Sequence, residues 1–332
     1  MSSAHSQKNL SNPPQTILTP RFLGSRVSGL ESLAGSLKVS SKDLLDLAEN
    51  ADSYYRLVER EAKPDGSFRE KYDTNEPLKS LLQAINSRFL KRCDYPDYLT
   101  GSLKGWSYLK NAQLHAGQGT IISIDATNFF PSISQSSVKD IWFNLLQFEE
   151  TAAETLSKLC TRRGFLAQGA PPSSFLANLA FWDIEPLIVA QLRSQGFKYS
   201  RYVDDIVVSH ERHLTRVQKT GAIKAAQKVF LSKGLKIKTR KTKVADRNRC
   251  QTVTGLNVNS GRARLPKKKQ RLLRASVYRF VKDSAGEMGT YQERLTRFRS
   301  LEGKILSLRQ TGSKVADQLL KSLRTARPTK AE

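Results

Sequence analysis

Two short β-branched apolar segments flank a pair of carboxylates near the middle of the chain. Val203 and the run 206–208 favour strands, and Asp204 and Asp205 lie between them. This pattern predicts a β-hairpin with both acids at or beside its turn. Adjacent carboxylates repel each other, and a divalent cation such as Mg²⁺ removes that cost because it binds carboxylate oxygens. An ordinary surface turn made of two Asp residues is the alternative.

A second apolar run predicts a buried strand that ends in an acid. Residues 120–124 are almost entirely β-branched, and Asp125 follows them directly. A carboxylate at the end of a buried strand is well placed to bind a metal ion, although a helix N-cap or a turn residue is the alternative. Phe129 and Phe130 come next and could simply be core residues.

Helical periodicity and turn residues predict most of the remaining elements. Ser40 has the features of a helix N-cap, and the segment 63–66, Lys-Pro-Asp-Gly, is a strong turn signal between two strands. That hairpin carries Arg69 and Lys71, which could equally be solvated cations. Helices are expected over residues 135–160, 175–192, 211–233, 267–280, 289–308 and 313–325, a strand over 241–244, and a hairpin over 252–266 that turns at 259–261.

Composition and charge narrow the class of partner. The chain has 332 residues, of which 39% are hydrophobic, enough for a substantial core. Its 55 Lys and Arg residues against 30 Asp and Glu residues give a net charge of +25, which favours a polyanion such as nucleic acid. An anionic membrane surface is the rival, but no apolar run approaches the length of a spanning helix, and membrane association is not expected. The segment 262–332 alone holds 19 basic and 6 acidic residues, a one-sided charge that suits phosphate.

The cysteines and the N-terminus give weaker indications. Cys93, Cys160 and Cys250 form neither a metal-binding spacing nor a disulfide framework, which predicts three small buried residues in a reducing cytoplasm. The N-terminus lacks the apolar core of a signal peptide. Residues 1–25 are rich in Ser, Asn, Gln and Pro, and we expect a loose tail or an arm that packs against the domain.

The motifs follow one order: a basic hairpin, a strand ending in Asp-Phe-Phe, a Gln-Gly loop, the Asp-Asp hairpin, a Lys strand and basic helices. This order resembles the reverse transcriptases over residues 40–280. Two shorter motifs resemble bacterial retron reverse transcriptases in particular. They are the Asn-Ala-x-x-His element with Asn111, Ala112 and His115, and the triplet Val253, Thr254 and Gly255.

Three departures from the family pattern accompany this resemblance. Val203 stands where retron enzymes mostly have Ala, and the Gln-Gly loop over 166–174 differs from the usual sequence on both sides of its central residues. Lys238 lies near a position that often holds Asn. None of these departures affects the carboxylates.

The resemblance implies an α+β right-hand polymerase fold with fingers, a palm built on an antiparallel sheet, and a helical thumb. We expect an N-terminal extension over 1–39, fingers and the start of the palm over 40–119, the palm with inserted fingers elements over 120–260, and a basic helical thumb over 261–332.

The resemblance also implies a two-Mg²⁺ centre for phosphoryl transfer. Asp125 and Asp204 would bind both ions, with Asp205 as a weaker third ligand. The carbonyl of Ala126 would also contact a metal ion, and Lys241 would donate a proton.

The resemblance assigns further residues to the substrates. Arg69 and Lys71 would bind the triphosphate, and Gln168 and Gly169 would pack against the nucleotide. Phe130 would exclude the 2′-hydroxyl, and Tyr202 would contact the primer. The residues implied in RNA binding are Lys267, Lys268, Lys269, Arg271 and Arg274.

The function implied is RNA-directed DNA synthesis. A retron enzyme copies part of a structured non-coding RNA into a branched RNA–DNA hybrid (msDNA), uses dNTPs, and acts in anti-phage defence with a separate effector protein. Another bacterial defence reverse transcriptase or a group II intron-like enzyme is the first alternative, although the chain lacks room for the additional regions of an intron protein. A non-catalytic RNA-binding protein is the second alternative, and the three carboxylates argue against it.

Overall fold

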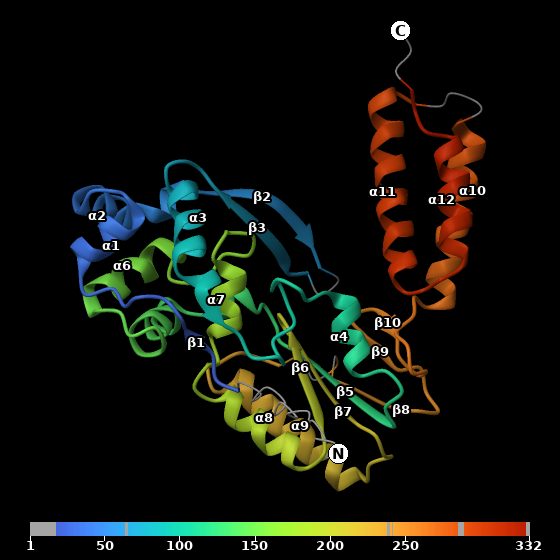
Figure 1. Cartoon of the computed structure of the whole chain (residues 1–332), viewed down its shortest axis with the longest axis horizontal. Coiled ribbons are helices and arrows are strands. Elements are labelled where there is room, and N and C mark those ends of the chain that lie inside the picture. The colour runs from blue at the N-terminus through green and yellow to red at the C-terminus, as the bar shows by residue number, and fades with distance from the viewer. Residues whose placement is uncertain (1–17, 64–65, 238–239, 241, 285–288, 330–332) are drawn as a thin grey trace, which may run out of the picture. The chain divides into compact units, whose positions relative to one another are not determined.

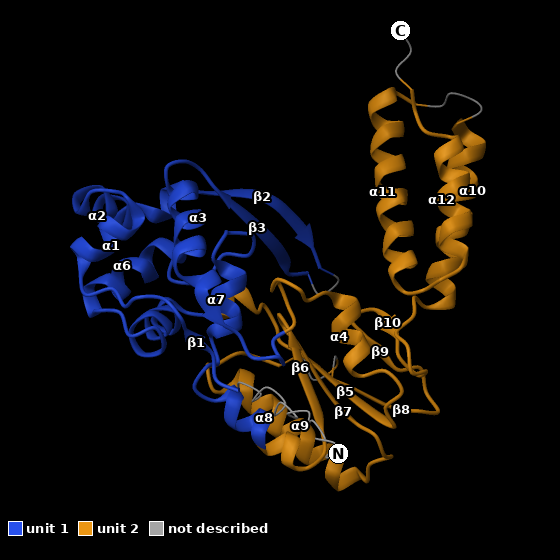
Figure 2. Ribbon diagram, viewed as in Figure 1, with its two compact units in different colours: residues 1–99, 133–190 blue, residues 100–132, 191–332 orange. Residues whose placement is uncertain are grey.

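The computed structural model describes residues 18–63, 66–237, 240, 242–284 and 289–329. The chain divides into two compact units, and Figure 2 colours them separately. Unit 1 comprises Met1–Leu99 and Ile133–Ala190, and unit 2 comprises Thr100–Ser132 and Gln191–Glu332. Both helices and strands contribute to the chain, so the predicted α+β class is confirmed at this level. No helix among the described residues combines the length and the apolar character needed to cross a membrane.

Unit 1 is mainly helical and packs around leucine-rich helix faces. Leu44, Leu82 and Leu156 come from three of its helices and are fully buried. Ser40 caps α2 as predicted, because its hydroxyl accepts a hydrogen bond from the backbone N–H of Asp43. The helices are α1 (Leu30–Leu37), α2 (Ser41–Glu49), α3 (Leu78–Arg88), α5 (Gln135–Asp140), α6 (Glu150–Cys160) and α7 (Ser173–Leu179), with most of α8 (Glu185–Ser194) and the short 3₁₀ turns η1 (Ala51–Tyr54) and η2 (Leu90–Arg92).

The predicted basic hairpin forms a two-stranded antiparallel sheet in unit 1. Strand β2 (Tyr55–Ala62) pairs with β3 (Phe68–Thr74), with one register shift between Leu57 and Glu59. Most of its side chains are exposed or half-buried, so this hairpin extends its charged residues into solvent.

The described part of the N-terminus is an arm that packs against unit 1. Strand β1 (Arg21–Phe22) pairs with β4 (Cys93–Asp94), and the hydroxyl of Tyr98 donates to the carbonyl of Leu18. The packed arm is therefore the correct alternative for residues 18–25, while residues 1–17 lie outside the described residues.

Unit 2 is built on a four-stranded antiparallel sheet with the order β6-β7-β5-β8 (Figure 1). The strands are β5 (Thr120–Asp125), β6 (Lys198–Tyr202), β7 (Asp205–His210) and β8 (Lys243–Asp246). Helix α9 (Arg216–Leu231) packs against β5 and β7, and α4 (Tyr108–Leu114) contacts β6. Strands β5 and β7 are the two apolar runs of the sequence, and their central residues are buried because they lie inside this sheet.

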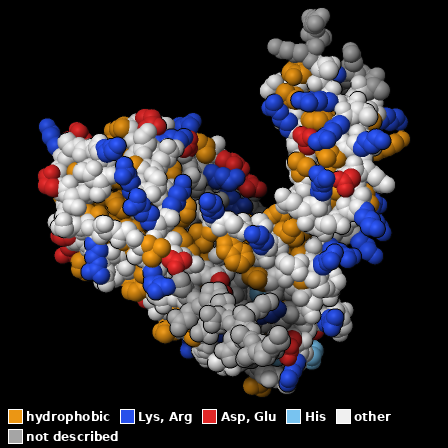
Figure 3. All heavy atoms as spheres, viewed as in Figure 1, with side chains coloured by type: hydrophobic (Ala, Val, Ile, Leu, Met, Phe, Trp, Pro, Cys, Tyr) orange, Lys and Arg blue, Asp and Glu red, His pale blue; other side chains and the backbone are white. Residues whose placement is uncertain are grey.

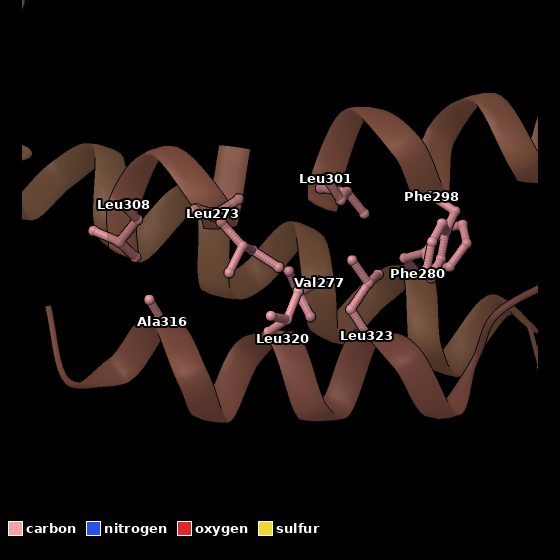
Figure 4. Packing of buried hydrophobic residues seen from close by; sticks show 10 residues of the cluster. Leu273, Val277, Phe280, Phe298, Leu301, Leu308, Ala316, Leu320 and Leu323 are labelled. Carbon is pink, nitrogen blue, oxygen red and sulfur yellow. The ribbon is translucent and has the colours of Figure 1, made fainter. Parts of the chain in front are cut away.

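A three-helix bundle ends unit 2, as the periodicity predicted. Helices α10 (Lys267–Ser284), α11 (Tyr291–Gln310) and α12 (Val315–Thr325) share one apolar core. Figure 4 shows its side chains pointing toward one another between the helices. The buried members are Leu273, Val277, Phe280, Phe298, Leu301, Ile305, Leu308, Ala316, Leu320 and Leu323.

Two of the predicted helices are interrupted. Residues 135–160 form α5, the π-helical turn η4 (Ile141–Leu145) and α6, because Gln147 adopts a left-handed φ of 57° that no helix can continue through. The segment 175–192 is divided into α7 and α8. Pro186 lies in the first turn of α8, where its missing N–H has no helical partner to lose.

The hairpin predicted over 252–266 turns earlier than expected. Strands β9 (Thr252–Val253) and β10 (Leu256–Asn257) pair around Thr254 and Gly255, not around 259–261. The later pairing survives as one antiparallel bridge, in which Asn257 and Arg264 exchange two backbone hydrogen bonds of 2.8 Å. The turn lies at Thr254 and Gly255 because it requires a left-handed φ, which Gly255 adopts without steric cost.

One cysteine prediction is wrong. Cys93 and Cys160 are buried, but Cys250 is exposed. It lies in the loop between β8 and β9, after the exposed residues 247–249, so it is a surface thiol.

Candidate active site

All three predicted carboxylates belong to unit 2, two of them on adjacent strands and the third in the turn between β6 and β7. Asp125 ends β5 and Asp205 begins β7, and the two are directly opposite in the antiparallel register. Their Cβ atoms therefore project from the same face of the sheet. The backbone N–H of Ala126 donates to the carbonyl of Asp204 at 3.4 Å, which holds the hairpin turn beside the end of β5.

The donor chemistry of this cluster suits a hard divalent cation. Across the described residues, no group of three or more His, Cys, Asp or Glu side chains is arranged to hold a metal ion by itself. Mg²⁺ does not require such a cage, because it keeps several waters and is usually bound through one or two carboxylates together with substrate phosphates. Opposed carboxylates at a strand end fit that kind of open site.

The turn between β6 and β7 has an unusual backbone. Tyr202 pairs with Asp205, so Val203 and Asp204 form a two-residue loop. Val203 has a φ of 58°, in the left-handed region that β-branched residues rarely adopt. Tight hairpin loops that need a positive φ at this position favour glycine. The sequence pattern predicted the turn but not its conformation.

Gly101 is a residue that the sequence analysis missed. A Cβ added to Gly101 would lie 2.5 Å from the backbone nitrogen of Val203 and 3.1 Å from the carbonyl carbon of Tyr202. The preceding Thr100 donates its backbone N–H to the carbonyl of Arg201 at 3.0 Å. The segment 100–101 therefore packs directly on the backbone of the Asp-Asp hairpin. A glycine in an irregular connector gave no signal that could have identified it.

The Asn-Ala-x-x-His motif lies behind the same hairpin and is completely buried. Asn111 and His115 both have no exposed surface. Their side chains form a polar network with hydroxyl groups from both strands of the hairpin. Its bonds are His115 Nδ1 to Ser209 Oγ at 2.7 Å, His115 Nε2 to Ser200 Oγ at 2.8 Å, Ser200 Oγ to Asn111 Oδ1 at 2.7 Å, and Thr100 Oγ1 to Asn111 Oδ1 at 2.9 Å.

The second retron-like motif lies next to the first. Val253 belongs to the same buried apolar cluster as Ala112, together with Ile121 and Val207 of the four-stranded sheet. Thr254 donates its hydroxyl to the carbonyl of Tyr108 in α4 at 2.7 Å. Two motifs separated by about 140 positions in the sequence thus pack as one substructure of unit 2.

The nucleotide-binding candidates divide between the units. Arg69, Lys71, Gln168 and Gly169 belong to unit 1, whereas Phe130 and Tyr202 belong to unit 2. Within unit 1, the backbone N–H of Tyr72 donates to the carbonyl of Gln168 at 2.8 Å, so the Gln-Gly loop is attached to β3.

The conformation of that loop depends on glycine. Gly169 has a φ of 104°, and an added Cβ would lie 2.6 Å from the carbonyl oxygen of Tyr72. Of the two cations on β3, Arg69 is exposed and Lys71 forms a 2.7 Å ion pair with Glu59. Phe130 is half-buried and packs edge-to-face on Phe129.

The predicted RNA-binding residues are available to a partner. All five lie on α10 and are exposed, and Figure 3 shows Lys and Arg side chains distributed over the visible face of the helical bundle. They are Lys267, Lys268, Lys269, Arg271 and Arg274. Lys241 and Lys238 lie outside the described residues.

Comparison with known proteins identifies the family. Residues 62–258 match the family model for reverse transcriptase (RNA-dependent DNA polymerase). The Retron Se72 reverse transcriptase of Salmonella heidelberg (strain 579083-10) is 33% identical over 303 residues, covering 90% of this chain and 80% of that protein. This chain belongs to the retron reverse transcriptases. It is accordingly an RNA-dependent DNA polymerase, and an RNA template and dNTPs are its substrates.

Other retron enzymes show similar relationships. The Retron Ec48 and Ec86 reverse transcriptases of Escherichia coli are 30% and 28% identical, over 76% and 84% of this chain and 64% and 86% of their own lengths. Among solved structures, a telomerase from Candida albicans in complex with a telomeric RNA fragment matches at a TM-score of 0.44 and 9% identity. That match covers 86% of this chain and 65% of the telomerase chain.

Proposed function

We propose that this retron reverse transcriptase copies part of a structured non-coding RNA into a branched RNA–DNA hybrid (msDNA) in a bacterial cytoplasm. In this proposal the product acts in anti-phage defence together with a separate effector protein. The observation that carries the catalytic part is the placement of Asp125 opposite Asp205, with Asp204 in the adjoining turn. The similarity to several retron enzymes favours this function over that of a group II intron-like enzyme.

The proposal assigns the parts of a right-hand polymerase to the chain. Residues 1–39 would be an extension, 40–119 fingers and the start of the palm, 120–260 the palm with inserted fingers elements, and 261–332 the thumb. The four-stranded sheet in unit 2 and the bundle α10–α12 support the palm and thumb assignments.

The carboxylates would provide the metal centre. Asp125 and Asp204 would bind two Mg²⁺ ions, with Asp205 and the carbonyl of Ala126 as further contacts, and the ions would stabilise the charge that develops on the attacking and leaving oxygens. Asp125 and Asp204 both adjoin the β5–β7 pairing. The backbone hydrogen bonds of that pairing therefore set the relative positions of their backbones.

The remaining proposed roles concern the nucleotide. Arg69 and Lys71 would bind the triphosphate, and Lys71 would exchange its partner Glu59 for phosphate. An exposed ion pair of this kind contributes at most about 1 kcal/mol, so the exchange costs little. Gln168 and Gly169 would pack against the incoming nucleotide.

Three further residues complete the proposed nucleotide site. Phe130 would exclude a 2′-hydroxyl, which would give a preference for dNTPs. Tyr202 would contact the primer end, and Lys241 would donate a proton to the leaving pyrophosphate.

Recognition of the RNA is assigned to the basic bundle. The exposed cations of α10 would bind phosphates of the template–primer and of the structured RNA, a contact that weakens with salt.

Co-expression of the protein with the RNA encoded beside it tests this function. Extracts should contain a small DNA whose mobility changes after RNase treatment, and sequencing should show one branched product. The double variant D204N/D205N should make none, and the exposed substitution Asp46→Asn in α2 should leave the yield unchanged. Normal DNA yield from D204N/D205N would refute the proposed catalytic site, and unbranched products from several RNAs would favour another defence reverse transcriptase.

A further inference from the structure

The buried network behind the Asp-Asp hairpin connects both of its strands through one histidine. Ser200 lies on β6 and Ser209 on β7, and the two nitrogens of His115 bond one hydroxyl each. Asn111 extends the network to Thr100, whose backbone N–H and hydroxyl also reach the carbonyl of Arg201. The network therefore fixes β6 two residues before Tyr202 and β7 four residues after Asp205.

The hydrogen bonds of this network have a defined direction. Ser200 donates its hydroxyl proton to Asn111 Oδ1, so it must accept from His115 Nε2–H. His115 Nδ1 then accepts from the hydroxyl of Ser209. The bonds that join His115 to Ser200 and Ser209 can form in only one arrangement of the two strands, whereas an apolar contact of the same size tolerates sliding.

Complete burial excludes a direct role in binding RNA. Neither Asn111 nor His115 exposes any surface, and the side-chain hydrogen bonds shown for them among the described residues go to the connector before α4 and to the hairpin. These bonds reach both strands that flank the turn carrying Asp204, and Asp205 begins the second of these strands.

We propose that Asn111 and His115 are positioning residues that hold the β6–β7 hairpin, and with it Asp204 and Asp205, in the geometry that DNA synthesis requires. The inference rests on the proposed catalytic role of those two acids. It explains the Asn-Ala-x-x-His motif through the active site and not through RNA recognition.

The test compares a single and a triple variant. His115→Leu removes the imidazole that bonds the Ser209 hydroxyl and one of the two partners of the Ser200 hydroxyl, and should destabilise the fold. The triple variant H115L/S200A/S209A removes those hydroxyls together with the imidazole, so the free energy of unfolding should recover substantially. If Asn111 and His115 contributed only to stability, the triple variant would recover its activity together with its free energy of unfolding.

Positioning predicts that activity does not recover. The single-turnover rate constant for dNTP incorporation does not depend on the fraction of active enzyme. In the triple variant this rate constant should stay at least about tenfold below wild type, because misplacement of reacting groups by about 1 Å lowers a rate on the order of 100-fold. The Kd for the RNA and the dNTP concentration at half-maximal rate should be unchanged.

A control variant separates stability from positioning. Thr161 is buried in unit 1, whereas the hairpin belongs to unit 2, and it donates its hydroxyl to the carbonyl of Ser157 at 2.8 Å. Thr161→Val should lower stability without changing the single-turnover rate constant. A wild-type rate constant in the triple variant would overturn the inference, and if D204N/D205N is inactive at the same time, the proposed function still stands.

Discussion

Gly101 lies against Val203 so closely that a Cβ on Gly101 would approach the Val203 nitrogen to 2.5 Å and its Cγ2 to 2.7 Å. Val203 has a left-handed φ of 58° in the turn that carries Asp204. A glycine in one segment thus allows a strained turn in another, and both belong to the environment of the proposed catalytic carboxylates.

Substitution of Gly101 by alanine should displace this turn. The shortest of these contacts, at 2.5 Å, is with the backbone nitrogen of Val203, so a side-chain rotation of Val203 alone cannot relieve it. We expect Gly101→Ala to reduce the rate of dNTP incorporation by at least about tenfold, because small displacements of catalytic groups are costly. The matched substitution Gly221→Ala in α9, where an added Cβ meets nothing within 4 Å, should keep full activity. Equal rates for the two variants would contradict the prediction.

The strain at Val203 should be measurable as stability. A left-handed conformation costs a non-glycine residue roughly 1–2 kcal/mol, and Asn tolerates it better than a β-branched residue. Val203→Asn is therefore expected to raise the free energy of unfolding by about 1 kcal/mol in urea titrations. The substitution Val207→Asn is the comparison, because Val207 is buried in a regular strand and its replacement should destabilise strongly. Lower stability of Val203→Asn would show that the contact of the Val203 side chain with Gly101 outweighs the strain.

The Gln-Gly loop should respond to substitution through nucleotide binding. Gly169→Ala would place a Cβ 2.6 Å from the Tyr72 carbonyl and separate the loop from β3. We expect the KM for dNTP to rise about tenfold or more, since a contact worth about 1.4 kcal/mol changes affinity tenfold, with RNA affinity unchanged. Gly164→Ala is the control, because Gly164 also has a left-handed φ of 78° but open space around it. If both variants raise KM equally, backbone strain and not the contact with β3 is responsible.

His115 should make the protein sensitive to mild acid. Complete burial, with a smaller effect of Lys198, lowers the pKa of His115 from 6.5 to about 3. His115 is therefore protonated below about pH 6.5 in the unfolded chain, but only below about pH 3 in the folded chain. The contribution of neutral His115 to stability is complete above pH 6.5 and is lost as the pH falls toward 3, at up to about 1.4 kcal/mol per pH unit.

Urea titrations between pH 7 and 5 measure this dependence. The slope of unfolding free energy against pH should be shallower in H115L/S200A/S209A than in wild type, because the titrating group is absent. Identical slopes for wild type and the triple variant would contradict the lowered pKa.

Local pattern alone was sufficient for much of this protein. Runs of β-branched apolar residues predicted β5 and the β6–β7 hairpin, and the turn signal Lys-Pro-Asp-Gly predicted the β2–β3 hairpin. Helical periodicity predicted the three C-terminal helices, because it reports which face of a helix is buried. The motif order indicated a reverse transcriptase, and the Asn-Ala-x-x-His and Val-Thr-Gly motifs indicated a retron enzyme; the comparisons confirmed both. The predicted functions of the individual site residues remain to be tested.

Relationships between distant segments were decided only by the tertiary structure. No local period could show that Asp125 pairs opposite Asp205, that Gly101 packs on Val203, or that His115 joins two strands from behind. The same holds for the interruption of the helix predicted over 135–160 and for the exposure of Cys250. Sequence periodicity describes an element and its buried face, whereas strand register, close backbone approach and buried hydrogen bonds depend on which elements meet.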